Sequence, residues 1–355
     1  MELYQIVEVT EAFNHAGTKA TADVAAIADR LGFRRVNIKM DTAADSAFGK
    51  IRRQIGYFRD WKRSGDIIAP GSVLLLQHPF HHKQLTREKT LRKIKEKGAR
   101  VISLVHDVEE LRGFRYSDYY AGEFRTMLEL ADIIIVHNDV MKKWFISRGV
   151  EEEKLISLGI FDYLRETGEE TPAWFEKSIM VAGNLDTKKC GYIGQLGRLE
   201  GVRVHLYGPN YDEKLRNVEN IEYHGSWPVD EIPSKLDRGF GLVWDGEDIS
   251  GCVGESGQYL RYNNPHKLSL YLSAGLPVIL WSGAAETEFV RENGVGICVE
   301  DLRELGKIFE DFTPDRYRQL LENVKRTGQK IREGYYGSKA VSEALARLEI
   351  KNRGA

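Results

Sequence analysis

Cysteine is scarce in this sequence, and its few copies are scattered. The 355 residues include only Cys190, Cys252 and Cys298. An odd number at wide spacing excludes a disulfide framework and a paired-cysteine metal motif, and it is typical of a reducing compartment. A strong charge of either sign is also lacking, because the formal net charge is -2. This balance argues against a dedicated nucleic-acid-binding protein, which would carry a strongly basic surface.

Long apolar runs and a signal-peptide pattern are lacking as well. No run reaches the roughly 18 apolar residues of a membrane helix, and the first residues carry acids where a signal peptide carries Lys or Arg. We therefore expect a cytoplasmic protein. The hydrophobic content of 42% is that of a folded chain. The length exceeds the about 250 to 300 residues that one core supports, which predicts two domains.

Short apolar runs alternate with helical patterns along the whole chain. Strands are expected at 3–9, 34–40, 72–77, 100–107, 132–138, 178–184, 202–208, 220–225, 239–245, 276–281 and 294–299, with helices between them and a helical tail from about 301 to 350. This alternation predicts βαβ units and parallel sheets covered by helices on both faces.

An acidic stretch with Gly and Pro interrupts the alternation at 161–177 and is the predicted linker. We predict a Rossmann-like domain at 1–160, a second at 178–335, and a C-terminal helix at 336–355 that packs back on the first domain. In open α/β sheets ligands bind beyond the carboxyl ends of the strands, so functional residues are expected directly after strands.

The stretch "NNPHKLSLYLSAGLPVIL" at 263–280 places a lysine in the first turn of a helix. The positive end of a helix dipole disfavours a cation unless an anion binds there. Asn264, His266 and Lys267 therefore mark a candidate diphosphate site. The competing interpretation is a lysine that points to solvent.

Other strand ends carry weaker signals. Gly183 and Asn184 precede Lys188, which suggests either an anion-binding turn or a solvated helix start. Tyr207 and Gly208 open a Gly-Pro-Asn sequence that is first of all a turn signal, although it is also placed to contact a base or ribose. Asp245 is a candidate donor contact, and the segment after it is expected to be a structureless lid over 246–262, whose acids lack metal-ligand spacing.

The first half offers two further candidates. Gly17 and Thr18 lie between a strand and its helix without a GxGxxG fingerprint, yet the loop is suited to bind an anion through backbone amides. His106 and Asp107 end a strand, where either side chain is placed to act as a general base, although Asp107 is equally suited to cap the next helix. The basic amphipathic stretch 49–63 is either a solvated helix face or a contact with an anionic membrane surface.

The motifs "VAGN", "LYGPN", "FGLVWDGE" and "YNNPHKLSLYLSAGLPVIL", together with "HAGTKA" and "HDVEELR", resemble the bacterial β-1,6-galactofuranosyltransferase family and the related streptococcal adhesin glucosyltransferases. The resemblance spans nearly the whole chain. It implies a GT-B fold with the acceptor held by the first domain and a UDP-sugar donor by the second, no essential metal or other cofactor, and a homo-oligomer. By position, it implies donor contacts for Lys267, the Gly17-Thr18 loop, the turn after Asn184 and Trp227.

These observations lead to the expectation of an inverting hexosyltransferase that moves galactofuranose or glucose from a UDP-sugar to a glycan, lipid-linked sugar or glycoprotein. Lys267 and helix amides would stabilise the leaving diphosphate, and Asp107 or His106 would be the base. Two alternatives stay open: a non-catalytic subunit of the same fold, and a nucleotide-sugar 2-epimerase.

Overall fold

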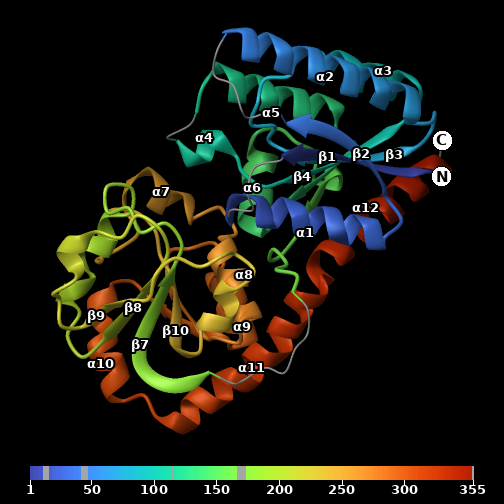
Figure 1. Cartoon of the computed structure of the whole chain (residues 1–355). Helices are drawn as coiled ribbons and strands as arrows, with labels where there is room; N and C mark the ends of the chain where they lie inside the picture. The colour runs from blue at the N-terminus through green and yellow to red at the C-terminus, as the bar shows by residue number, and fades with distance from the viewer. Residues whose placement is uncertain (11–15, 41–46, 114–115, 166–172, 354–355) are drawn as a thin grey trace.

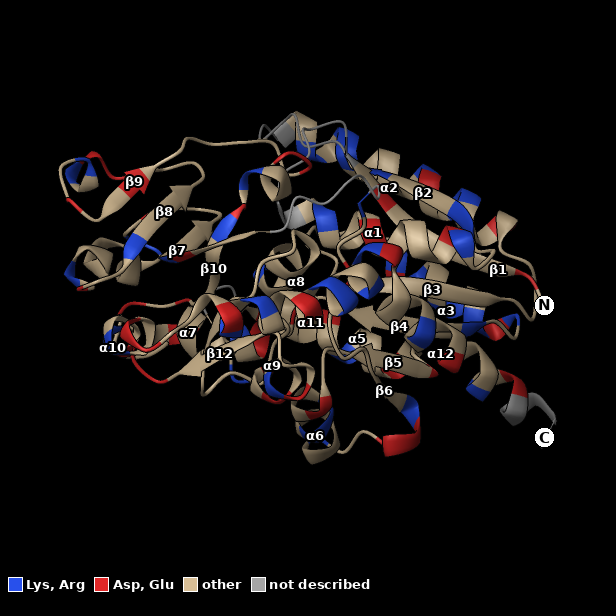
Figure 2. Ribbon diagram, turned by 90° about the horizontal axis from the view of Figure 1, so that it is seen from below, with Lys and Arg blue, Asp and Glu red and all other residues tan. Residues whose placement is uncertain are grey.

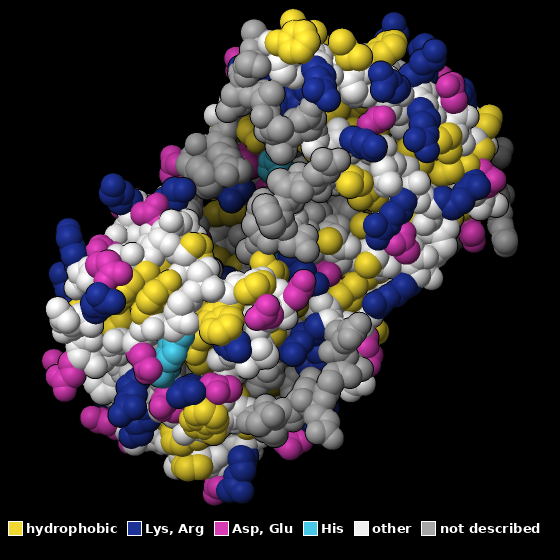
Figure 3. All heavy atoms as spheres, viewed as in Figure 1, with side chains coloured by type: hydrophobic (Ala, Val, Ile, Leu, Met, Phe, Trp, Pro, Cys, Tyr) yellow, Lys and Arg dark blue, Asp and Glu magenta, His cyan; other side chains and the backbone are white. Residues whose placement is uncertain are grey.

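The computed structural model describes residues 1–10, 16–40, 47–113, 116–165 and 173–353. Figure 1 shows two lobes, each built around its own sheet, and the face drawn in Figure 3 is hollowed between them. Acidic and basic positions are mixed over both lobes (Figure 2). Within the described residues no helix is long and apolar enough to cross a membrane. The two α/β halves that the sequence predicts are therefore present.

The N-terminal sheet is parallel in the order β2-β1-β3-β4-β5-β6. Its elements are β1 (Leu3–Thr10), α1 (Ala16–Arg30), β2 (Arg34–Met40), α2 (Ala47–Ile67), β3 (Val73–His78), α3 (Arg87–Glu96), β4 (Arg100–Val105), α4 (Glu109–Arg112), α5 (Asp118–Leu130), β5 (Ile133–Val136), α6 (Asp139–Ser147) and β6 (Leu155–Ser157). All four residues of β5 are buried, as expected for a strand covered on both faces. Apolar clusters lie on both sides of the sheet and form its core.

The C-terminal sheet is parallel in the order β12-β11-β10-β7-β8-β9. Its elements are β7 (Trp174–Ala182), a 3₁₀ helix (Gly191–Arg198), β8 (Arg203–Tyr207), β9 (Ile221–Tyr223), β10 (Arg238–Val243), α7 (Gly254–Tyr259), α8 (His266–Ser273), β11 (Val278–Trp281), α9 (Thr287–Asn293), β12 (Gly296–Val299), α10 (Leu305–Glu310), α11 (Pro314–Glu333) and α12 (Tyr335–Arg353). The order of the strands reverses between the parallel neighbours β7 and β10, because β8 and β9 follow on one side and β11 and β12 on the other. A reversal of this kind creates a ligand crevice at the carboxyl ends of the two strands.

The last two helices connect the domains. Gly334 ends α11 with a positive φ of 82°, and α12 then runs beside α1 in the N-terminal lobe (Figure 1). Ala340, Val341, Ala344 and Leu348 of α12 belong to a core cluster of the first sheet. The C-terminal helix is therefore part of the N-terminal core.

Three sequence expectations differ from the structure. The strand β6 is three residues long and gave no recognisable apolar pattern. The strand β7 begins at Trp174, inside the predicted linker. Its first four residues, two aromatic and two charged, are exposed or half-buried, so they form no apolar run that the sequence pattern could show. The prediction that 246–262 is structureless is wrong: it contains α7 and a bridge between Asp248 and Gly251, and burial of Ile249, Cys252 and Tyr259 anchors it.

Candidate functional site

Lys267 lies at the crevice between β7 and β10. It is the second residue of α8, whose N-cap residue, Pro265, offers no side-chain cap. Its Nζ atom is 3.4 Å from the carbonyl oxygen of Trp244, directly after β10. Its Cε atom lies 3.6 Å from the position that a Cβ on Gly183, directly after β7, would take. The side chain is partly buried between the two strand ends, so the interpretation of a solvent-directed lysine is wrong.

The negative charge of Asp245 helps to keep this lysine charged. Burial is the largest single influence and favours the neutral amine, but Asp245, together with smaller contributions from Tyr271, Cys190 and Cys252, leaves the pKa of Lys267 raised above its ordinary value. The Asp245 carboxylate itself accepts a hydrogen bond of 2.8 Å from the amide of Gly246. A cation and the N-terminus of α8 thus lie at the same crevice, which is an arrangement suited to a diphosphate.

Two glycines allow the backbone at the end of β7 to lie close against the backbone at the end of β8. Gly183 and Gly208 follow β7 and β8 with φ values of 133° and 146°. A Cβ on Gly208 would lie 1.8 Å from the carbonyl oxygen of Gly183, so no side chain fits. Asn184 fixes the first turn by accepting hydrogen bonds from the amide of Asp186 and from Asn210.

His106 and Asp107 lie after β4, on the N-terminal side of the interface. The His106 Nε2 atom is 2.7 Å from Gln77 Oε1, and the ring stacks on Phe161 with centroids 5.3 Å apart. Burial lowers the pKa of His106 to about 3, with further lowering by nearby histidines, so the imidazole is neutral near pH 7.

The Asp107 carboxylate connects the two domains. One oxygen pairs with Arg112 at 2.8 Å, and the other accepts a hydrogen bond of 3.3 Å from Tyr259 of α7. The N-cap residue of α4 is Val108, so the alternative that Asp107 caps this helix is wrong. The carboxylate side chain remains 25% exposed, which leaves it accessible from the interface.

Other predicted residues lie outside the Lys267 cluster. Asn264 joins the domains, because its amide donates to His137 Nδ1 at 2.9 Å and its side chain donates to the carbonyl of Gly159. The ring of His266 packs on Tyr163 with centroids 5.1 Å apart. Lys188 is exposed on the turn after β7.

Two aromatic candidates lie at the β8–β9 edge of the sheet. Tyr207 stacks on His224 with ring centroids 4.7 Å apart. Trp227 is 41% exposed and lies under the ammonium group of Lys235. The structure therefore brings Lys267, Gly183 and Asp245 together, whereas Tyr207 and Trp227 belong to a neighbouring region.

The predicted loop at 17–18 is instead the first turn of α1. Lys19, the next residue, donates to Asp23 at 2.6 Å and to the carbonyl of Leu164 at 2.7 Å. Its ammonium lies 4.9 Å from the centroid of the Tyr163 ring. This turn therefore meets the segment that joins the domains.

Sequence reasoning missed a pocket beside Asp107. It has a volume of about 320 Å³ and lies beyond the ends of β3 and β4. Tyr116, Tyr120 and Phe124 line it together with Glu109 and Arg125. Glu109 is buried, and its Oε2 atom has no hydrogen-bond partner among the described residues. Apolar rings with a few polar groups are typical of small-ligand sites.

A buried acid also lies at the domain interface. Asn138 donates to Glu286 Oε1 at 2.8 Å. Burial raises the pKa of Glu286 from 4.5 to about 8, with the Asn138 hydrogen bond opposing the shift and Asp139 adding to it. The folded protein therefore holds a proton on Glu286 in a pH range where the unfolded chain releases it.

We expect Glu286→Gln to change the pH dependence of stability. Between pH 4.5 and about 8, wild-type stability falls as pH rises, by up to about 1.4 kcal/mol per pH unit from this group. The glutamine variant should lack this contribution. When the pH is raised from 6 to 7, the free energy of unfolding in urea should fall by about 1 kcal/mol more for wild type than for the variant. Glu288→Gln, an exposed acid on α9, should show no such gain, and an equal gain there would contradict the assignment.

The comparisons with known proteins agree with this geometry. The N-terminal domain model of Glucosyltransferase 3-like proteins matches residues 4–160, and the C-terminal domain model matches residues 179–344. The β-1,6-galactofuranosyltransferase WbbI of Escherichia coli (strain K12) is 36% identical over 257 residues, 71% of this chain and 73% of that protein. Glucosyltransferase 3 of Streptococcus gordonii is 26% identical over 345 residues, 96% of this chain and 98% of that protein.

Solved structures show the same fold. HepE of Anabaena, in complex with UDP, has a TM-score of 0.59 at 12% identity and covers 98% of this chain and 100% of its own. A glycosyltransferase of Rickettsia africae has a TM-score of 0.61 at 13% identity, with 99% of both chains covered. These likenesses confirm the GT-B architecture, and the family resemblance seen in the sequence is confirmed with it. The chain belongs to the Glucosyltransferase 3-like family of GT-B glycosyltransferases.

Proposed function

We propose that this protein transfers a hexosyl group, galactofuranose or glucose, from a UDP-sugar to a glycan or glycoconjugate acceptor. The observation that carries the proposal is the Lys267 ammonium, held charged by Asp245 at the crevice between β7 and β10. The names of the relatives, a galactofuranosyltransferase and a glucosyltransferase, support the two sugars. UDP in the HepE structure supports the nucleotide.

In this proposal the reaction is an inverting displacement. The acceptor hydroxyl loses its proton to Asp107 and attacks the anomeric carbon, while the bond to UDP breaks. The charge that develops on the diphosphate is stabilised by Lys267 and the first amides of α8, without a metal ion. His106 is the poorer base, because burial disfavours the charged imidazolium that it would become, and its ring is stacked on Phe161 and hydrogen-bonded to Gln77.

The aromatic pocket beside Asp107 is the proposed acceptor site. Its rings offer faces for sugar stacking, and Arg125 and Glu110 supply polar groups beside them. The pocket is lined by residues of the N-terminal domain, among them Val108 and Glu109, which directly follow Asp107 in the sequence. A pocket for an acceptor favours the transferase hypothesis over the 2-epimerase hypothesis, because a 2-epimerase has no second substrate to bind.

The test is release of UDP from a panel of UDP-sugars in EDTA. We expect slow hydrolysis of UDP-galactofuranose or UDP-glucose, and UDP binding by calorimetry under the same conditions. Binding that vanishes in EDTA and returns with Mg²⁺ or Mn²⁺ would contradict the metal-free mechanism. A protein that binds UDP and hydrolyses none of the sugars would support the non-catalytic subunit instead.

A peripheral membrane contact through α2 belongs to the same proposal. Phe48, Ile51, Ile55 and Phe58 recur at helical spacing and are 78%, 60%, 55% and 55% exposed. Arg52, Arg53 and Arg59 line a groove with three of these apolar residues. An apolar stripe flanked by basic side chains suits the surface of an anionic bilayer, where a lipid-linked acceptor would be found.

We expect the protein to co-float with phosphatidylglycerol vesicles and to leave phosphatidylcholine vesicles unbound. A Phe48→Ser/Phe58→Ser variant should bind about tenfold more weakly or worse, because two exposed rings no longer enter the bilayer. Val140→Ser on α6, also an exposed apolar residue, is the control and should bind like wild type. If the double variant instead changes the oligomeric state and leaves vesicle binding intact, the stripe is a contact between copies of the chain.

A further inference from the structure

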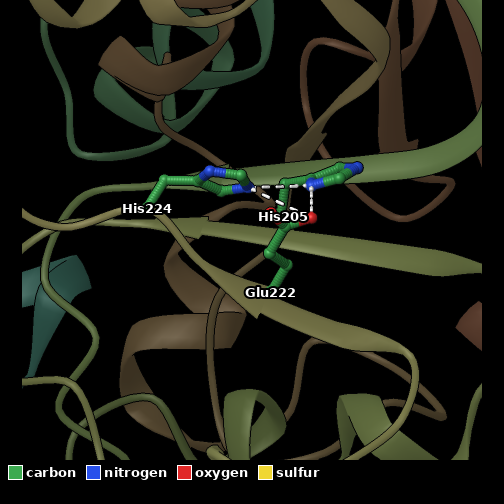
Figure 4. A group of neighbouring side chains, drawn as sticks. All are labelled: His205, Glu222 and His224. Atoms are coloured by element: carbon green, nitrogen blue, oxygen red, sulfur yellow. Dashed lines mark hydrogen bonds and ion pairs between the residues drawn. The ribbon is translucent and has the colours of Figure 1, made fainter.

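Two histidines and a glutamate gather at the outer edge of the C-terminal sheet. His205 lies on β8, Glu222 lies on β9, and His224 follows β9 directly (Figure 4). The sheet register pairs His205 with Glu222. Because side chains alternate along a strand, His224 returns to the same face two residues after Glu222. The strand pairing thus brings three metal-binding side chains together from two separate stretches of sequence.

Their ligand atoms form a small triangle. His205 Nδ1 is 2.9 Å from His224 Nε2 and 3.6 Å from Glu222 Oε2, and the third side of the triangle is 3.8 Å. A tetrahedral ion with bonds of about 2.0 to 2.1 Å places its ligand atoms roughly 3.3 to 3.4 Å apart. The three distances lie on both sides of that value. Rotation of the exposed Glu222 side chain adjusts the two longer distances, and rotation of the partly exposed His224 ring adjusts the shorter one.

A fourth residue orients His205 for this role. The Nε2 atom of His205 is 2.8 Å from Glu176 Oε2. A carboxylate accepts hydrogen bonds, so the proton of the neutral ring lies on Nε2 and the lone pair of Nδ1 faces His224 and Glu222. Histidine ligands of metal ions commonly donate their second ring nitrogen to a carboxylate in this way.

We propose that His205, Glu222 and His224 bind a divalent transition metal ion, with Zn²⁺ the best match. Two imidazoles and one carboxylate favour Zn²⁺ over Mg²⁺ and Ca²⁺, which prefer oxygen ligands. The His205 side chain is 2% exposed, His224 23% and Glu222 66%, so an ion reaches the site without unfolding and keeps a fourth position for water.

The ion would have a structural role. The triad lies on β8 and β9, whereas the donor crevice is at β7 and β10, so the site is separate from the proposed metal-free reaction. The edge strand β9 has only three residues. His224 also stacks on Tyr207, and its carbonyl accepts a hydrogen bond of 2.8 Å from Trp227 Nε1. Metal binding would therefore fix β9 and the turn that carries Trp227.

The test uses the whole protein after dialysis against a chelator. We expect one Zn²⁺ per chain by calorimetry, a melting temperature that rises with Zn²⁺ concentration, and visible absorption of tetrahedral Co²⁺. Glu222→Gln removes a ligand charge at an exposed position and should weaken Zn²⁺ binding at least tenfold. Glu176→Gln should weaken it by about 10- to 100-fold through His205. Glu200→Gln, an exposed acid nearby, is the matched control and should bind like wild type.

Circular dichroism and metal-free melting of each variant show whether its fold is intact. Glu222 and Glu176 are changed in separate variants. If one variant fails to fold, the other still tests the proposal. Absence of stoichiometric Zn²⁺ binding, or wild-type affinity in both variants, would overturn the proposal and leave the triad as a hydrogen-bonded strand pair.

Discussion

Replacing Lys267 by Ala is expected to weaken UDP binding by about 10- to 150-fold. A charge-assisted hydrogen bond to a diphosphate contributes roughly 1.5 to 3 kcal/mol, and this range converts directly to that loss of affinity. Uridine carries no phosphate and should bind wild type and variant almost equally. Calorimetry with UDP and uridine measures both quantities.

Loss of Lys267 is also expected to affect the stability of the protein. Lys267 is partly buried and is the counter-charge of Asp245, so its loss is also expected to lower the melting temperature of the ligand-free protein. Lys177→Ala removes an exposed lysine on β7 and is the matched control for both measurements. If Lys267→Ala binds UDP as tightly as wild type, or loses uridine and UDP affinity equally, the diphosphate is not its partner.

Asp107→Asn is expected to lower kcat by about 10²- to 10⁴-fold, the usual contribution of a general base. Asparagine keeps the size of the side chain and an oxygen that can still accept from Arg112 or Tyr259. The KM for the donor should change little, because the carboxylate is not part of the Lys267 cluster. Initial rates at saturating UDP-sugar and acceptor measure the effect.

His106→Gln is the paired variant. Burial lowers the pKa of the His106 ring to about 3, and its Nε2 atom is already hydrogen-bonded to Gln77, so we expect the ring to take little part in proton transfer. We expect a far smaller loss of kcat from it. Tyr259→Phe tests whether the Asp107 effect arises from the domain contact alone, and it should retain most activity. Near-wild-type kcat in Asp107→Asn together with a large loss in His106→Gln would move the base to His106.

The sequence by itself determined most of the elements, although not β6 or α7, because the signals of the others are local. Apolar runs bounded by turn residues predicted all the strands except β6, and the bounds of β2 match at 34–40. A local pattern also predicted that Lys267 lies in the first turn of a helix. Periodicity and capping act over a few residues, so a linear pattern is enough to read them.

Only the tertiary structure decided which side chains meet. Asp245 follows the strand β10 and Gly183 follows β7, yet both lie beside Lys267 because the sheet order places β7 next to β10. Domain packing joined Asp107 to Tyr259, and strand pairing joined His205 to Glu222 within one sheet. These contacts depend on strand order, register and domain packing, which arise from the summed burial of many side chains and leave no local pattern in the sequence.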